Sequence, residues 1–135
     1  MPNFAIAYLA SAAVFFALDF VWLSVATRIL YRPMLGDLLA DNPNLVVAAA
    51  FYLVYLVGLV VFTVLPAAHS GSWLQAIGLG ALLGLVAYGT YDFTNLSTIR
   101  NWPAMVSMVD LAWGVTVSAI AALAGYGAVK MFGTV

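Results

Sequence analysis

The chain has 135 residues, of which 66% are apolar and 7% are charged, and its formal net charge at pH 7 is −1. A soluble domain with so few charged groups would aggregate, so we expect the lipid bilayer to be its solvent. The charge balance offers no basic surface for nucleic acid, and the absence of cysteine excludes disulfides, thiol catalysis and thiolate metal sites.

Four segments are long and apolar enough to cross a membrane as helices, which takes about 20 residues each. They cover residues 4–27, 45–65, 73–96 and 104–131. The first segment has no basic leader and is too long for the apolar region of a secretory signal, so we expect it to be retained. The sequence therefore predicts one all-α domain over residues 1–135, a compact bundle of four transmembrane helices.

The connections between these segments are short, apart from the first. Residues 28–44 carry Arg28 and Arg32, and apolar residues recur through their middle at helical spacing. This pattern predicts a short helix lying in the membrane interface. Between the second and third segments, we expect a turn that begins at Pro66 and ends at Ser72.

Basic residues indicate how the chain is oriented, because short loops rich in Lys and Arg stay on the cytoplasmic side. Arg28, Arg32 and Arg100 fall on one side of the membrane, whereas the other side has Lys130. We therefore predict that both termini lie outside the cytoplasm.

Small residues recur four positions apart in several segments, as at Gly80 and Gly84. Such pairs allow helices to approach closely in lipid, where no hydrophobic force presses them together. This spacing also favours a compact bundle.

A polar stretch at the end of the third segment has a counterpart in the first. Residues 19–24 and 92–97 share the pattern Asp-Phe-x-x-Leu-Ser, and each is followed by an Arg and then a Pro. We interpret this as a parallel two-plus-two repeat of helix pairs. A chance match is the alternative, because Phe and Leu are abundant in this chain.

Three aspartates fall inside the predicted helices: Asp19, Asp92 and Asp110. A charged carboxylate near the membrane centre costs about 3 kcal/mol on insertion scales, so such residues face the bundle interior and usually mark function. At about 1.5 Å per helical residue, each lies roughly 10–13 Å from the side that carries the arginines. The three carboxyl groups could therefore share one layer of the bundle.

Helical spacing adds aromatic and polar neighbours to this layer, because positions three and four apart share a helix face. Carboxylates beside aromatic rings suit a cation or a flat apolar ligand. Structural roles are the alternative, as hydrogen-bonded buried groups or interfacial anchors. We assign no catalytic residue and expect neither a metal nor a cofactor. The predicted ligand-binding residues are Asp19, Trp22, Tyr88, Asp92, Asn95, Arg100, Asp110 and Trp113.

Four motifs together resemble a small bacterial membrane family, domain of unknown function 2177. They are Leu-Asp-Phe-Val-Trp-Leu at 18–23, Tyr-Arg-Pro-Met-Leu-Gly at 31–36, Tyr-Asp-Phe-Thr-Asn-Leu-Ser at 91–97 and Val-Asp-Leu-Ala-Trp-Gly at 109–114. The resemblance covers nearly the whole chain. It implies a four-helix protein of the bacterial inner membrane and carries no activity with it.

Three functions fit these features. The first is a protein that binds or carries a small cationic, proton-coupled or lipid-like ligand at the cluster of aspartates and aromatic residues. The second is an accessory or assembly subunit of a larger membrane complex, and the third is an intramembrane lipid-modifying enzyme. The enzyme is the least favoured, because no nucleophile or metal centre is present. Besides the bilayer, the expected partners are a second copy of the chain or a larger complex.

Overall fold

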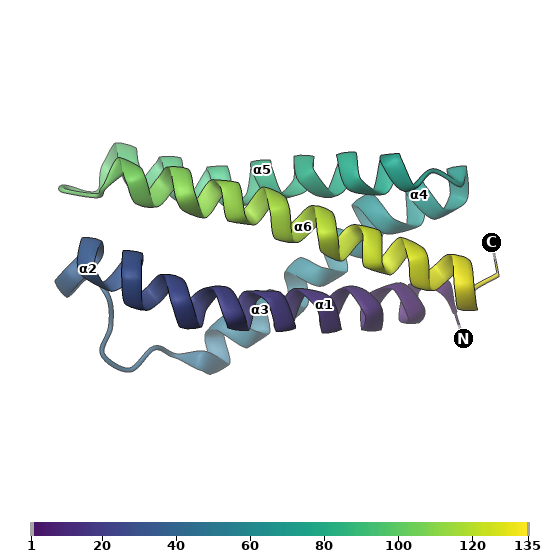
Figure 1. Ribbon diagram of the computed structural model, residues 1–135, viewed down its shortest axis with the longest axis horizontal. Helices are drawn as coiled ribbons and strands as arrows, with labels where there is room; N and C mark the ends of the chain where they lie inside the picture. The colour runs from purple at the N-terminus through teal and green to yellow at the C-terminus, as the bar shows by residue number, and fades with distance from the viewer. Residues whose placement is uncertain (1, 135) are drawn as a thin grey trace.

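The computed structural model describes residues 2–134 as four long helices that run lengthwise beside one another (Figure 1). The long helices are α1 (Asn3–Ala26), α3 (Leu45–Leu59), α5 (Trp73–Thr98) and α6 (Ala104–Phe132), and the short ones are η1 (Thr27–Tyr31), α2 (Arg32–Leu35), η2 (Gly36–Leu38), η3 (Val60–Val64) and α4 (Leu65–Ser70). With their short extensions, the four are long and apolar enough to cross a membrane. The predicted all-α membrane fold is confirmed.

The first helix continues beyond its predicted end. A π-helical turn, η1, follows α1 directly, and α2 and η2 prolong the helix to Leu38. The segment predicted as a separate interfacial helix is therefore an extension of α1. A π-helical turn is wider than an α-helical one and changes the direction of the side chains that follow. Tyr31, the last residue of η1, is buried as a result.

The second helix also runs past its predicted end, so the turn expected from Pro66 is wrong. Pro66 lies just after the π-helical turn η3, and such local adjustments allow proline inside a membrane helix. The helix ends at Gly71, whose φ of 74° is the left-handed conformation that glycine adopts at helix ends. Ser72 then caps α5, because its side chain accepts a hydrogen bond of 3.1 Å from the backbone N–H of Gln75.

α6 is the central helix and packs along both α5 and α1. Its contact with α5 is close because α5 presents glycines there, as their four-residue spacing predicts. A Cβ atom added at Gly80 would lie 2.8 Å from the carbonyl oxygen of Ser118, and one added at Gly84 would overlap the carbonyl of Gly114. The backbones of α5 and α6 therefore meet directly.

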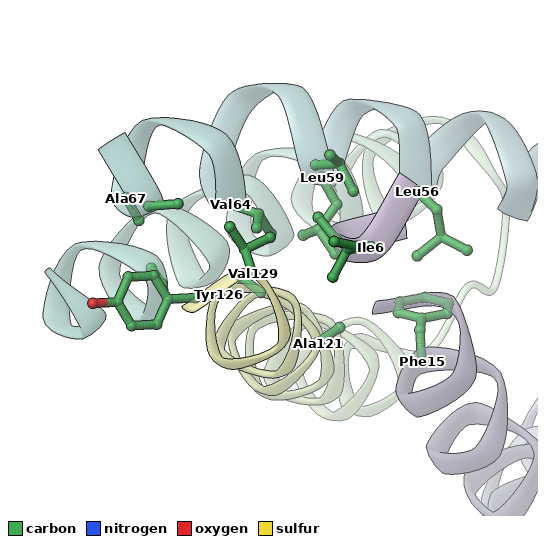
Figure 2. Packing of buried hydrophobic residues seen from close by; sticks show 14 of the residues in the cluster. Ile6, Phe15, Leu56, Leu59, Val64, Ala67, Ala121, Tyr126 and Val129 are labelled. Carbon is green, nitrogen blue, oxygen red and sulfur yellow. The ribbon is translucent and has the colours of Figure 1, made fainter. Parts of the chain in front are cut away.

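Two apolar clusters fill the bundle. The larger one joins all four long helices on the side of the termini, and Figure 2 shows Phe15, Leu56 and Val129 among its members. The smaller one, with Ala26 and Val106, lies near the end that carries the arginines. On α1, Asp19 lies between Phe15 of the larger cluster and Ala26 of the smaller one.

α3 departs from the bundle toward its N-terminal end. Every residue from Asp41 to Phe51 is exposed, and the buried residues of α3 are Leu56 and Leu59. Figure 1 shows α3 inclined to the other long helices. Its contacts with α5 and α6 are sparse. The exposed half of α3 is apolar, as a surface in contact with lipid should be.

Candidate functional site

Asp19 is a buried carboxylate with a donor for each oxygen. Its side chain is 3% exposed on α1. The Tyr52 hydroxyl of α3 donates to Oδ2 at 2.7 Å, and the Trp113 indole N–H of α6 donates to Oδ1 at 3.0 Å. Buried charged groups are stable when hydrogen-bonded in this way. Asp19 therefore ties α1 to α3 and α6.

A chain of contacts extends from Asp19 to Asp110. The Trp113 ring stacks on Trp22, with centroids 4.6 Å apart and ring planes 4° from parallel. The Trp22 indole N–H donates to the Tyr31 hydroxyl at 3.0 Å, and this hydroxyl donates to Asp110 Oδ1 at 2.6 Å. Networks of this kind hold their members in fixed positions. Tyr31, at the end of η1, is therefore the residue that links Trp22 to Asp110.

Asp92 differs from Asp19 in having no donor. The side chain is 0% exposed, yet neither carboxyl oxygen has a hydrogen-bond partner among residues 2–134. The Asp110 carboxyl lies near enough to Asp92 to share a hydrogen bond with it when one of the two carboxyl groups carries a proton. An unsatisfied buried polar group is costly, and one in a native structure requires an explanation.

The backbone around Asp92 is firmly held. The Ser107 hydroxyl of α6 donates to the Asp92 backbone carbonyl at 2.8 Å, and the Trp102 indole N–H donates to the Ser107 oxygen at 3.0 Å. These bonds fix the end of α5 against α6. The backbone of Asp92 is thus held in place, although its carboxyl group has no hydrogen-bond partner among the described residues.

Asp92 and Asp110 line one cavity of about 470 Å³, here called the aspartate cavity. Its size is that of a small-molecule site. Most of its wall is apolar and comes from the first helix, the following loop and the exposed half of α3. Its polar and aromatic residues are Thr27, Tyr31, Arg32, Tyr91, Asp92, Trp102 and Asp110.

A second cavity of about 350 Å³, here called the aromatic cavity, lies between α1, α3, α5 and α6. Tyr88 is fixed there because its ring lies on Gly114, where a Cβ atom would overlap it, and because it packs edge-on against Tyr55. The cavity is lined by Phe15, Phe51, Tyr52, Tyr55, Ala87, Tyr88, Tyr91 and Asp110.

Six of the eight predicted residues either belong to the network that joins Asp19 to Asp110 or line a cavity, and the remaining two do neither. Asn95 is half-buried one helical turn beyond Asp92, and Arg100 is exposed in the connection between α5 and α6. Neither residue lines either cavity.

Sequence reasoning missed Tyr31 and Tyr52, the hydroxyl donors to Asp110 and Asp19. Tyr31 was placed in an interfacial helix and Tyr52 was not included among the predicted site residues. The position of Tyr31 in one of the four motifs was the available signal for it.

No cluster of three acidic, histidine or cysteine side chains able to hold a metal ion occurs among residues 2–134. The charged groups of the aspartate cavity are the two carboxyl groups and Arg32, which is exposed. The cavity therefore combines buried hydrogen-bond acceptors with an apolar wall. Such a site suits a ligand that donates hydrogen bonds and carries positive charge.

Residues 4–127 match the model of a family described as predicted membrane protein, DUF2177. The chain belongs to this family. The match includes every residue of the two cavities, and it confirms the resemblance carried by the four motifs. The DUF2177 description names a membrane protein without an activity. Searches of curated proteins and of solved structures find no match for the chain.

Proposed function

We propose that this DUF2177 protein binds a small cationic ligand, such as a primary ammonium group, at Asp92 and Asp110. The observation that carries the proposal is the Asp92 carboxyl, which is fully buried and lacks a hydrogen-bond partner among the described residues, on a residue that borders a cavity. An ammonium group has three donors and no acceptor. It supplies both the hydrogen bonds and the positive charge that Asp92 lacks.

A proton is the other species that can neutralise Asp92. A carboxylate ion buried without a partner is far more costly than a neutral acid, so we expect Asp92 to be protonated when no cation is bound. Binding of an ammonium ion then displaces this proton. The groups around Asp92 that carry charge or can titrate are Tyr31, Arg32, Tyr91 and Asp110. Ligand binding is thus coupled to proton release and weakens as the pH falls.

The network around Asp19 serves as the support of this site. It holds Trp113, Trp22 and Tyr31 in contact, and Tyr31 occupies one oxygen of Asp110. The Tyr31 hydroxyl engages one oxygen of Asp110, and the other oxygen can receive a ligand donor together with Asp92. Sites that bind well are held by such supporting contacts.

We place the aspartate cavity in the cytoplasmic half of the bacterial inner membrane, with both termini outside. Arg28, Arg32 and Arg100 lie at the end of the bundle nearest this cavity, and Lys130 lies toward the other end. The excess of basic residues at one end supports this orientation.

A titration of the purified protein in lipid nanodiscs with ethylammonium chloride tests the proposal. Each charge-assisted hydrogen bond contributes about 1.5–3 kcal/mol, so Asp92→Asn should weaken binding roughly 10- to 150-fold. Asp37→Asn is the matched control, because Asp37 is an exposed aspartate outside both cavities. Equal affinity for the two variants would refute the proposal.

A second candidate is a subunit of a larger membrane complex, favoured by the exposed apolar half of α3 beside the aspartate cavity. A side chain of a partner helix would then satisfy Asp92. Purification from the native membrane distinguishes the two functions. A stoichiometric partner that is lost in Asp92→Asn and retained in Asp37→Asn supports the subunit, and a chain isolated without a partner supports ligand binding.

A further inference from the structure

The aspartate cavity and the aromatic cavity meet at two residues. Tyr91 of α5 and Asp110 of α6 line both. Asp110 therefore borders both the cavity that contains Asp92 and the aromatic cavity. A group held at Asp110 lies next to both cavities.

The wall of the aromatic cavity suits a hydrocarbon chain. Phe15 is completely buried at one side, whereas Phe51 on α3 is 64% exposed. Two of its four tyrosine hydroxyls are engaged elsewhere, since Tyr52 donates to Asp19 and Tyr55 bonds Ser118 at 2.6 Å. Aromatic rings make up most of the wall and offer apolar surface to the cavity.

The aromatic cavity borders the side of α3 that faces lipid. α3 diverges from the other helices, is exposed from its first residue to Phe51, and makes sparse contacts with α5. The helices α3 and α5 both contribute residues to the cavity. A bilayer molecule moving between these two helices would therefore reach residues of both cavities, because the aspartate cavity is also lined from α3 and α5.

We propose that the ligand is a single-chain amphiphile with a primary amine head, and that it enters from the bilayer between α3 and α5. The ammonium group lies at Asp92 and Asp110, and the hydrocarbon chain lies in the aromatic cavity. This inference rests on the proposed function, because it presumes ammonium binding at Asp92. It adds the chemical class of the ligand, its pose and its route.

Two probes separate the inference from the proposed function. Ethylamine tests the ammonium site alone, and dodecylamine tests the ammonium site together with the chain. Both are added to protein in nanodiscs as their protonated forms, and dodecylamine is scored by displacement of radiolabelled ethylamine. Dodecanol has the same chain without the charge and serves as the ligand control.

The decisive variant is Ala87→Phe, which fills the aromatic cavity from the α5 side. Its matched control is Leu85→Phe, because Leu85 is 47% exposed on the same helix and lines neither cavity. Ala87→Leu is a smaller change of the same kind and replaces Ala87→Phe if that variant does not fold.

We expect Ala87→Phe to weaken dodecylamine at least tenfold and to leave ethylamine unchanged, with both amines unchanged in Leu85→Phe. Equal dodecylamine affinity in Ala87→Phe and wild type, with ethylamine still bound, would overturn the inference and leave the proposed function standing. Displacement by dodecanol as effective as that by dodecylamine would also overturn it. Failure of both amines to bind the wild type would refute the proposed function as well.

Discussion

Asn substitution should lower the stability of the protein at Asp19 but not at Asp92, although both aspartates are buried. Asp19 accepts hydrogen bonds from Tyr52 and Trp113, and an Asn side chain can accept one of them while its NH₂ group faces the other donor. Hydrogen bonds between membrane helices contribute about 0.6–1.7 kcal/mol each. Asp19→Asn should therefore lower the free energy of unfolding by about 1–3 kcal/mol.

Asp92→Asn removes no side-chain hydrogen bond, since neither Asp92 oxygen has a partner among residues 2–134. We expect its unfolding free energy to remain within about 0.5 kcal/mol of the wild type, because a neutral acid has been replaced by a neutral amide of similar size. Reversible unfolding in mixed micelles of a mild detergent and dodecyl sulfate measures both variants. A loss for Asp92→Asn as large as that for Asp19→Asn would refute the distinction between a supporting and an unpartnered carboxyl.

Three further predictions concern the network, the helix contact and the cavity mouth. Tyr31→Phe removes the bond to Asp110 and should weaken ethylammonium binding about 3- to 10-fold in the nanodisc titration, with an unchanged value excluding a positioning role for Tyr31. Gly84→Ala should lower unfolding free energy by about 1–3 kcal/mol because its Cβ meets the α6 backbone, whereas Gly78→Ala, which meets open space, should be neutral or stabilising. Arg32→Gln removes an exposed like charge and should strengthen ethylammonium binding about 2- to 5-fold at low salt, an effect that vanishes at high salt; weaker binding would mean that Arg32 supports the site and does not repel the cation.

Much of the fold follows from features that act over one helix at a time. Apolar length is sufficient to predict the four helices, because a bilayer leaves a backbone few other ways to satisfy its hydrogen bonds. The cost of an exposed charge in lipid is sufficient to predict that Asp19 and Asp92 face inward. The spacing of Gly80 and Gly84 predicts the close approach to α6 for a similar local reason.

The errors arise where the helix departs from a regular period. The π-helical turns η1 and η3 are not visible in apolar spacing, so the extension to Leu38 and the passage through Pro66 were not predicted. The position of Tyr31 against Asp110 depends on this extension. A regular period of 3.6 residues also grouped Asn95 with Asp92, although Asn95 lines neither cavity.

The difference between Asp19 and Asp92 is not encoded locally at all. Both stand in the same Asp-Phe-x-x-Leu-Ser pattern, and the proposed repeat would make them equivalent. Their partners come from α3 and α6, and the inclination of α3 brings Tyr52 to Asp19 while leaving a cavity beside Asp92. Tertiary packing decides which copy supports the bundle and which remains without a partner. The repeat itself stays a prediction.

The infrared spectrum of the protein in nanodiscs, recorded with and without ethylammonium, tests the role of Asp92 most directly. A protonated buried carboxyl has a carbonyl stretching band that a carboxylate lacks. We predict that this band is present in the empty protein, disappears when ethylammonium binds, and is missing from Asp92→Asn but retained in Asp37→Asn. A spectrum that does not change on addition of ethylammonium, or that changes equally in Asp92→Asn, would contradict ammonium binding at Asp92.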